Sequence, residues 1–462
     1  MRESAQDKID TQHLRMTTAP IPGLVIRLAV PTVISMLVTA IYNTADTFFV
    51  SRLGTSASGA VGIVFSIMAI FHAIGLTFGT GAASMISRKL GANETGSAST
   101  YASTSFFLAF ATGLFLTLYG IFSLDEFMLK LGSTETILPY ARSYAMYILL
   151  GAPIMCTSFV MNNILRAEGK AAFAMIGLVT GALLNIVLDP IFIFTFGLGI
   201  SGAAIATVIS QCVSFLILLS VFILRKSNIR ISIYNISRRP KEYFDILTLG
   251  CPSLVRHGLA SIAAVTLNVA ASAYGDAAVA AMSIVARSSW LVLSVMLGLG
   301  QGFMPVSGYN YGAKNYARVK EAFWFTVKAG LLVMSILALL GFIFSKEIVS
   351  IFRKEDAEVI AIGSLAIRMQ FAALILQPLF MSTSMLFQST GHAVKATFLA
   401  SNKQGLYFIP LILILPKIFG ITGVQMAQPV SDILSFLTCI PFLYFYMKNL
   451  NELGRDNISE KR

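Results

Sequence analysis

Residues 172–197 read AFAMIGLVTGALLNIVLDPIFIFTFG and carry the clearest fold signal in the chain. Their length and apolar character suit a helix that crosses a bilayer, which needs about 20 such residues. Asn185 and Asp189 interrupt the run, and because they are four positions apart they lie on one helical face. Pro190 follows at once and removes a backbone N–H, so we expect a kink there. A carboxylate within a membrane costs at least about 2.5–3.5 kcal/mol, which makes Asp189 a candidate functional residue; the alternative is a hydrogen-bonded pair that only stiffens the bundle.

The composition extends this signal to the whole chain. Of 462 residues, 56% are hydrophobic and 12% are charged, and the mean hydropathy is +0.76. Soluble proteins carry about 25% charged residues, so we expect a polytopic membrane protein whose partner is the lipid bilayer. Residues 1–20 show no short apolar region before a small-residue cleavage site, so we expect the first apolar segment to be an uncleaved span.

Several functional classes lack support in the sequence. The net charge of +12 would suit a nucleic-acid partner, but the basic residues lie in short loops between apolar segments, which is typical of membrane proteins. The four cysteines fall inside apolar segments without metal-ligand spacing. No phosphate-binding Gly-Lys-Ser or Gly-Lys-Thr loop appears, and the spans hold no nucleophile–base pair. We therefore expect no nucleic-acid partner, no enzyme activity, no cofactor and no metal beyond a possible Na⁺; energy would come from an ion gradient or a partner chain.

The apolar segments predict an all-α integral membrane protein with twelve transmembrane helices. The first six spans are expected near residues 24–50, 57–82, 99–122, 138–164, 171–196 and 200–224. The second six are expected near residues 245–271, 278–303, 321–344, 359–385, 395–416 and 424–447.

The two halves of the chain repeat each other at a spacing of 221 residues. The matched pairs include Pro31 with Pro252, Gly54 with Gly275, Gly79 with Gly300, Gly81 with Gly302, Ser210 with Ser431, and Ser214 with Ser435. Six spans is an even number, so both halves share one orientation and form parallel repeats related by an axis along the membrane normal. We expect two six-helix lobes with a substrate path between them.

Lysine and arginine predict the orientation of these lobes. Segment 225–241 holds six of them, and further cations follow the even-numbered spans at Arg88, Lys89, Arg166, Lys170, Lys314, Arg318, Lys320, Lys395 and Lys403. Short loops rich in cations stay in the cytoplasm, so both termini should be cytoplasmic, in a protein of the cell's inner, cytoplasmic membrane. The predicted division is an N-terminal segment 1–20, an N-lobe 21–224, a basic linker 225–241, a C-lobe 242–447 and a tail 448–462; we expect a monomer.

Three spans of the first half place polar groups at one depth. Asp46, Asp189 and Thr207 each lie six or seven residues inside the outer end of their span, which is about 10 Å at 1.5 Å per residue. Asn185 lies one turn deeper. Carboxylate, amide and hydroxyl oxygens suit a hard cation or a proton. Two nearby carboxylates in a poorly solvated site repel each other, so each raises the proton affinity of the other. For Asp46 the alternative is a side chain that only reaches the outer interface.

Further polar and flexible side chains flank this group. Tyr144 lies near the outer end of the fourth span and could reach the cluster, although an interfacial tyrosine is the alternative. Candidates for a substrate cavity are Met36, Thr39, Tyr42 and Asn43 in the first span and Met155 and Ser158 in the fourth, where Asn162 also lies. Methionine suits promiscuous apolar recognition, but at helical spacing it is also common in ordinary packing.

The second half does not repeat the acids. Leu267 stands at the counterpart of Asp46, and Pro410 at that of Asp189. The charged residues of this half are Arg256, Arg287 and Asp432, and helical rise puts Arg287 and Asp432 at a similar depth. We expect a structural ion pair of Asp432 with Arg287 or Arg256.

Several motifs together resemble the multidrug and toxic compound extrusion (MATE) family, in its bacterial DinF-like, MepA-type branch. They are Pro31, ADTFFVSRLG at 45–54, GTGAASMISRKLGA at 79–92, ILRAEGK at 164–170, NIVLDP at 185–190 and GISGAAIAT at 199–207. The resemblance covers about residues 20–450. It implies two six-helix lobes around a central cavity and a coupling-cation cluster of Asp46, Asn185, Asp189 and Thr207, with Tyr144 and Asn162 as neighbours. Another branch carries an acid in the seventh span, where this chain has Arg256 and His257.

The function that the resemblance implies is secondary antiport. Lipophilic, often cationic compounds would be exported in exchange for H⁺ or Na⁺ by alternating access. The alternative is a flippase for lipid-linked precursors from the same superfamily; such proteins have more spans and a cationic cavity, for which Arg256 and Arg287 are the candidates.

Overall fold

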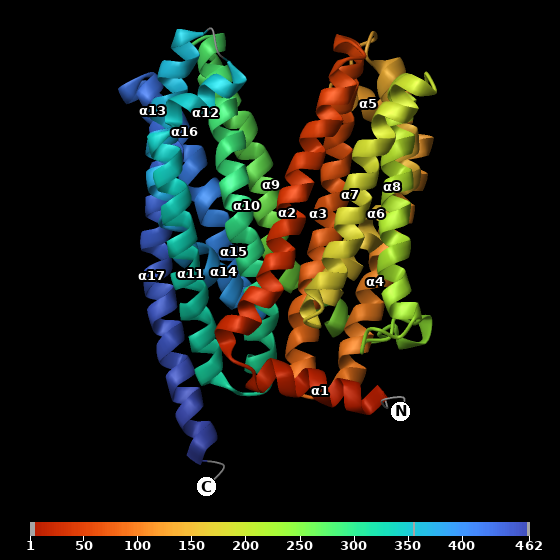
Figure 1. The fold of residues 1–462 in the computed structure, drawn as a ribbon, viewed down its shortest axis with the longest axis vertical. Helices are drawn as coiled ribbons and strands as arrows, with labels where there is room; N and C mark the ends of the chain where they lie inside the picture. The colour runs from red at the N-terminus through yellow and green to blue at the C-terminus, as the bar shows by residue number, and fades with distance from the viewer. Residues whose placement is uncertain (1–4, 354–355, 460–462) are drawn as a thin grey trace. The chain divides into compact units, whose positions relative to one another are not determined.

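A computed structural model describes residues 5–353 and 356–459, and every element within them is helical (Figure 1). Twelve helical segments there are long and apolar enough to cross a membrane, which confirms the predicted fold class. Residues 1–4 and 460–462 of the predicted terminal segments lie outside the described residues. The first half contains α1 (Ala5–Thr18), α2 (Ile21–Ser51), α3 (Thr55–Gly91), α4 (Thr95–Phe122), α5 (Leu124–Lys130), α6 (Leu138–Ala167), α7 (Ala171–Pro190), the π-helical turn η1 (Ile191–Thr195) and α8 (Gly199–Ile223).

The second half repeats this order after a short 3₁₀ turn, η2 (Ile233–Asn235), in the linker. Its elements are α9 (Pro240–Ser272), α10 (Asp276–Gly312), α11 (Tyr316–Ile343), α12 (Ser345–Phe352), α13 (Ala357–Leu374), α14 (Gln377–Ser389), α15 (Ala393–Ser401), the π-helical segment η3 (Asn402–Phe408), α16 (Ile409–Phe419) and α17 (Ile421–Ser459).

Several predicted spans are interrupted helices. Pro190 ends α7 and a π-helical turn follows, because proline removes one backbone donor from the helical ladder. The predicted tenth span divides into α13 and α14, and Pro378 occupies the first turn of α14, where a missing N–H is tolerated. The eleventh span contains the seven-residue π-helical segment η3 between two α-helices.

Two compact units divide the chain, and each contains part of both repeats. Unit 1 comprises Met1–Arg15 and Ile34–Gly250, and unit 2 comprises Met16–Val33 and Cys251–Arg462. The units therefore differ from the predicted lobes in two helices: α2 begins in unit 2 and ends in unit 1, whereas α9 begins in unit 1 and ends in unit 2. Pro31 and Pro252 lie within two residues of the two crossover points.

Close glycine contacts hold the crossing segments in place. In unit 1, a Cβ on Gly81 of α3 would overlap the carbonyl oxygen of Ile246 in α9. In unit 2, a Cβ on Gly302 of α10 would lie 2.5 Å from Ala29 Cα in α2. The second pair repeats the first, because Gly302 is the counterpart of Gly81. Only a residue without a side chain allows two helix backbones to approach this closely.

Unit 1 is built around α6. In an apolar stretch of 18 residues, α6 is 83% buried, whereas stretches of the same length in the spans of α3, α4, α7 and α8 are 28–33% buried. A small apolar cluster at one end joins α6 to its neighbours α7 and α8; its buried members are Met161, Leu165, Ala174, Leu218 and Val221. The neighbouring helices thus use one face for packing and leave the other for lipid.

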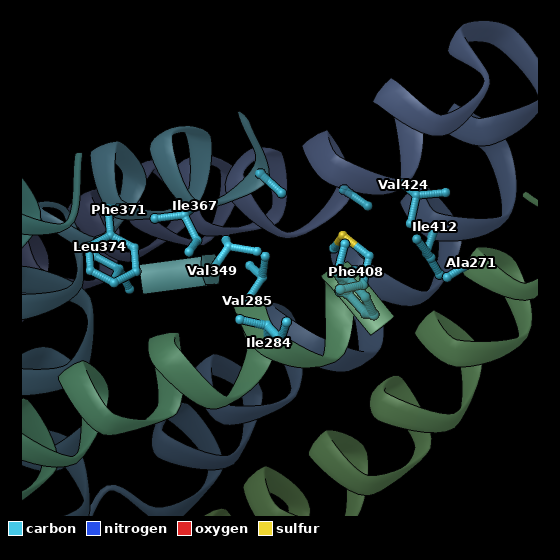
Figure 2. Close-up of a cluster of buried hydrophobic side chains, with 14 of the residues drawn as sticks. Ala271, Ile284, Val285, Val349, Ile367, Phe371, Leu374, Phe408, Ile412 and Val424 are labelled. Carbon is cyan, nitrogen blue, oxygen red and sulfur yellow. The ribbon is translucent and has the colours of Figure 1, made fainter. Parts of the chain in front are cut away.

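Unit 2 has a larger apolar core (Figure 2). Val285 of α10, Val349 of α12 and Ile367 of α13 meet at its centre. Phe408 of η3 and Val424 of α17 extend the core toward the last two spans. The short helix α12, which hydropathy did not predict, therefore contributes directly to the core of unit 2.

A buried carboxylate fixes the start of the linker on unit 1. Glu168 follows α6 and is fully buried, and its carboxylate accepts hydrogen bonds from Lys170 Nζ at 2.6 Å, Ser227 Oγ at 2.7 Å and the backbone N–H of Asn228 at 2.5 Å. Its backbone oxygen accepts from Gln12 Nε2 at 2.9 Å, which attaches α1 across the helix ends of unit 1 (Figure 1). Glu168 thus gives the ILRAEGK motif a structural role.

Candidate cation site in unit 1

Four helices of unit 1 bring most of the predicted cation-site residues together. Asp46 lies on α2, Tyr144 on α6, Asn185 and Asp189 on α7, and Thr207 on α8. Asn185, Asp189, Thr207 and Tyr144 are all at most 2% exposed, and Asp46 is half-buried. The cluster is therefore a buried polar island between apolar helices.

Asn185 organises the α7–α8 side of the cluster. Its amide nitrogen donates to Asp189 Oδ1 at 3.1 Å and to Thr207 Oγ1 at 3.2 Å. The four-residue spacing places Asn185 and Asp189 on the same face of α7, as the sequence predicted. Because the amide nitrogen of Asn185 donates to two partners, the orientation of its side chain is fixed. The direction of its carbonyl oxygen is fixed with it.

The two acids meet although they are far apart in sequence. The carboxyl groups of Asp46 and Asp189 lie within hydrogen-bonding reach of each other. Tyr144 lies beside Thr207 and close to both acids, and Tyr42, one turn before Asp46 on α2, is also near them.

Besides the Tyr144 hydroxyl, three carboxyl and amide oxygens in this cluster lack a hydrogen-bond donor. They are Asp46 Oδ1, Asp189 Oδ2 and Asn185 Oδ1, and each is buried. Within the described residues, no lysine, arginine or histidine forms an ion pair with either acid. Two carboxylates and an amide oxygen without donors fit a proton or a hard monovalent cation, because oxygen is the ligand that such ions prefer. Buried polar atoms without partners otherwise carry an energetic penalty.

Asn162 does not join the cluster, which corrects the prediction made for it. It lies 18 residues beyond Tyr144 on α6, which is about 27 Å of helical rise. Its amide instead donates to the backbone oxygen of Ala174 at 2.9 Å and ties α6 to α7. The sequence placed both residues in one span without resolving their separation along it.

The residues predicted for a substrate cavity differ in exposure. Met155 and Ser158 on α6 are 4% and 6% exposed, so both belong to the packed interior of unit 1. On α2, Met36, Thr39 and Tyr42 are half-buried and Asn43 is exposed.

The ion pair predicted for the second half has a different partner. Asp432 pairs with Lys403, whose Nζ lies 3.2 Å from Asp432 Oδ1, and not with Arg256 or Arg287. Arg256 Nη2 lies 3.4 Å from Ser384 Oγ, and Arg287 is exposed. The prediction compared depths only, and a match in depth does not determine the direction in which a side chain leaves its helix.

Lys403 is the charged residue whose position the sequence misjudged. We predicted it as a cation at the end of a span, but it lies inside the segment Ala393–Phe419, on η3, and its side chain is 13% exposed. The signal that could have found it is its distance of ten residues from the start of that segment.

Twelve spans in two repeated halves, with paired acids buried in one unit, define a polytopic helical membrane protein of the transporter type. The chain belongs to the MatE family, whose model matches residues 31–191 and 252–411. The two matched segments begin 221 residues apart, at the spacing of the internal repeat. The resemblance drawn from the sequence is thereby confirmed.

Curated relatives share most of their length with this chain. The multidrug export protein MepA of Staphylococcus saprophyticus is 28% identical over 425 residues, which covers 91% of this chain and 93% of the relative. MepA of Staphylococcus aureus is 27% identical over 443 residues, 96% and 97% of the two chains.

Solved structures share the fold. A MATE structure in the straight conformation has a TM-score of 0.90 at 28% identity and covers 95% of this chain and 99% of that one. A transporter of the MOP superfamily from Pyrococcus furiosus has a TM-score of 0.89 at 28% identity, with 95% and 98% coverage.

Proposed function

We propose that this protein is a secondary antiporter that exports lipophilic, often cationic compounds in exchange for H⁺ or Na⁺ by alternating access. The observation that carries the proposal is the set of three buried, donor-free oxygens on Asp46, Asp189 and Asn185. The multidrug export proteins among its relatives support the substrate class.

In this proposal the unit 1 cluster binds the coupling ion. Asp46 and Asp189 share one proton or one Na⁺. Asn185 holds Asp189 through its bond at 3.1 Å and is itself held by Thr207, to which it donates at 3.2 Å. The substrate favours the conformation in which this ion is absent. Exchange then follows from the difference in affinity between the two conformations, since a ligand shifts an equilibrium only by such a difference.

Charge distribution supports the orientation that we propose. The linker 225–241 carries six lysines and arginines and would lie in the cytoplasm, together with both termini. The half-buried or exposed side chains of Met36, Thr39, Tyr42 and Asn43 are our candidates for substrate contact, since they lie within the ten residues before Asp46 on α2.

Transport by purified protein in liposomes tests the proposal. A fluorescent lipophilic cation is loaded, and a pH gradient and a Na⁺ gradient are imposed separately. We expect at least one gradient to drive dye movement and the collapse of that gradient to stop it. Dye movement at the same rate with and without either gradient would overturn the assignment as an ion-coupled exporter. So would the absence of dye movement when the protein is correctly inserted.

A further inference from the structure

We propose that Lys403 is a tethered cation that neutralises a second, repeat-related ion site in unit 2, with Asp432 as its anion. In this view unit 2 needs no exchangeable ion. The inference deepens the proposed function, on which it rests, because it assigns all coupling ions to unit 1.

The geometry of the pair is that of a built site. Lys403 Nζ lies 3.2 Å from Asp432 Oδ1 and donates to Gln377 Oε1 at 3.0 Å. Gln428 Nε2 donates to Asp432 Oδ1 at 3.0 Å, and Gln370 Nε2 donates to Oδ2 at 2.9 Å. Each charged group therefore has at least two partners, contributed by η3, α17, α13 and α14.

The burial of Lys403 inside a membrane span has a cost in free energy, which suggests that the residue has a function. Asp432 is fully buried and the Lys403 side chain is 13% exposed. A lysine in the centre of a membrane span costs about 2.5–3.5 kcal/mol, so such residues usually mark ion or substrate sites. Replacing a buried ion pair by apolar residues is often neutral or stabilising, so stability alone does not account for keeping this one.

The repeat connects this pair with the unit 1 cluster. Gln428 stands 221 residues after Thr207, and both lie on the last span of their half; Thr207 accepts a hydrogen bond from Asn185, and Gln428 donates one to Asp432. Lys403 is the counterpart of Ala182, one turn before Asn185. The same pair of spans thus carries a polar cluster in each half.

The two clusters differ in their charge. Asp46 and Asp189 form no ion pair with a described residue, whereas Asp432 has the ammonium of Lys403 at 3.2 Å. Unit 1 therefore needs a cation from solution, and unit 2 carries its own. A covalently attached ammonium cannot leave during transport, so it takes no part in exchange.

Among the described residues, several polar atoms of Gln377 and of the two residues next to Lys403 in sequence have no hydrogen-bond partner. Gln377 Nε2, both amide atoms of Asn402 and Gln404 Oε1 are buried without a hydrogen-bond partner in the described part of the chain. Asn402, Lys403 and Gln404 are consecutive in η3, and π-helical segments are frequent at functional sites. The two oxygens that contact Lys403 Nζ, Gln377 Oε1 at 3.0 Å and Asp432 Oδ1 at 3.2 Å, remain available for a small cation if the ammonium is removed.

The test uses the full chain with the unit 1 acids removed. In the Asp46→Asn/Asp189→Asn background, Lys403→Gln leaves Asp432 as a buried carboxylate without its cation. We expect this variant to retain radioactive Na⁺ at mildly alkaline pH and to melt at a higher Tm in NaCl than in choline chloride, because a ligand that binds only the folded state stabilises it. The matched control adds Asp432→Asn and should lose both effects, and the background with native Lys403 should show neither.

Two results would overturn the inference. One is an Asp432-dependent Na⁺ effect in the background that keeps Lys403. The other is a Lys403→Gln variant that shows no Na⁺ effect, or that fails to fold in NaCl while its Asp432→Asn derivative folds. In that case the Lys403–Asp432 pair has only a structural role. Neither readout requires transport, so the outcome is independent of whether unit 1 couples export to an ion.

Discussion

Asn185 donates a hydrogen bond to Asp189 Oδ1 at 3.1 Å across one turn of α7. This bond occupies one oxygen of the carboxylate and leaves Oδ2 without a donor. Oδ2 therefore either binds a proton or a cation, or it stays buried without a partner at a cost in stability.

The first prediction concerns the two acids. Asp189→Asn and Asp46→Asn each keep the shape of the side chain but remove its charge, so we expect folded protein that still binds dye and has lost gradient-driven export. Because the two acids share one ion, the double variant should be little worse than either single variant. Dye binding and export by the same preparations in liposomes check this expectation.

The control for these variants is Asp276→Asn. Asp276 is exposed at the start of α10, and its replacement should leave export close to that of the unmodified protein. If Asp46→Asn and Asp189→Asn both export at the unmodified rate, the coupling site lies elsewhere.

The second prediction concerns Gly81. An alanine there would place Cβ on the carbonyl oxygen of Ile246, so α3 and α9 must separate. Overpacking of this kind costs about 1–3 kcal/mol, or more where backbone is displaced. We expect a lower apparent Tm in detergent and a smaller yield of monodisperse protein.

Gly62 on the same helix provides the matched control. It is exposed and a Cβ there would meet nothing within 4 Å. Gly62→Ala should leave the Tm unchanged or raise it, since alanine favours a helix over glycine by about 0.5–1 kcal/mol. Equal damage from both substitutions would refute the close crossing of α3 and α9.

The third prediction concerns Glu168. Glu168→Ala removes a buried carboxylate and leaves Lys170 Nζ without its 2.6 Å partner, which costs about 3–5 kcal/mol for a pair of this kind. We expect a marked fall in the apparent Tm and easier proteolysis of the linker, because Ser227 and Asn228 lose the same partner.

A surface ion pair serves for comparison. Glu94 is 47% exposed, and hydrogen bonds from Lys89 and Ser97 lower the pKa of its carboxyl group. Its contribution is therefore present above the ordinary carboxyl pKa and is lost as the pH falls through its lowered value. Glu94→Ala should cost no more than about 1 kcal/mol. A Tm loss as large as that of Glu168→Ala would contradict the contrast between the two sites.

The fourth prediction concerns orientation. Tyr234 is 94% exposed in the basic linker. In a background without the four native cysteines, Tyr234→Cys should resist a membrane-impermeant thiol reagent added to intact cells and should react once the membrane is opened. Asp276→Cys should react from outside. The reverse pattern would invert the proposed topology.

The sequence predicted those features that depend on a single helix and not on how helices pack together. Apolar length located the twelve spans, and the four-residue spacing of Asn185 and Asp189 put them on one face. The separation of Asn162 from Tyr144 along α6 was missed, as was the pairing of Asp432 with Lys403. Both depend on where side chains end up after helices pack, and depth counting along single spans does not contain that information.

Elements of weak hydropathy were also missed. α5 and α12 have only seven and eight residues, too short to be detected as spans. Lys403 was counted among the cations that follow the tenth span, although it lies on η3, ten residues inside the segment Ala393–Phe419.

The exchange of first helices between the units has a consequence for how such a chain is assembled. Unit 1 takes 240–250 from the second repeat, and unit 2 takes 16–33 from the first. A chain severed in its linker would give two fragments, neither of which encodes a whole unit, so they should be recovered only when co-expressed. Each repeat therefore completes its unit only with a segment of the other, so neither unit can finish folding before both repeats have been made.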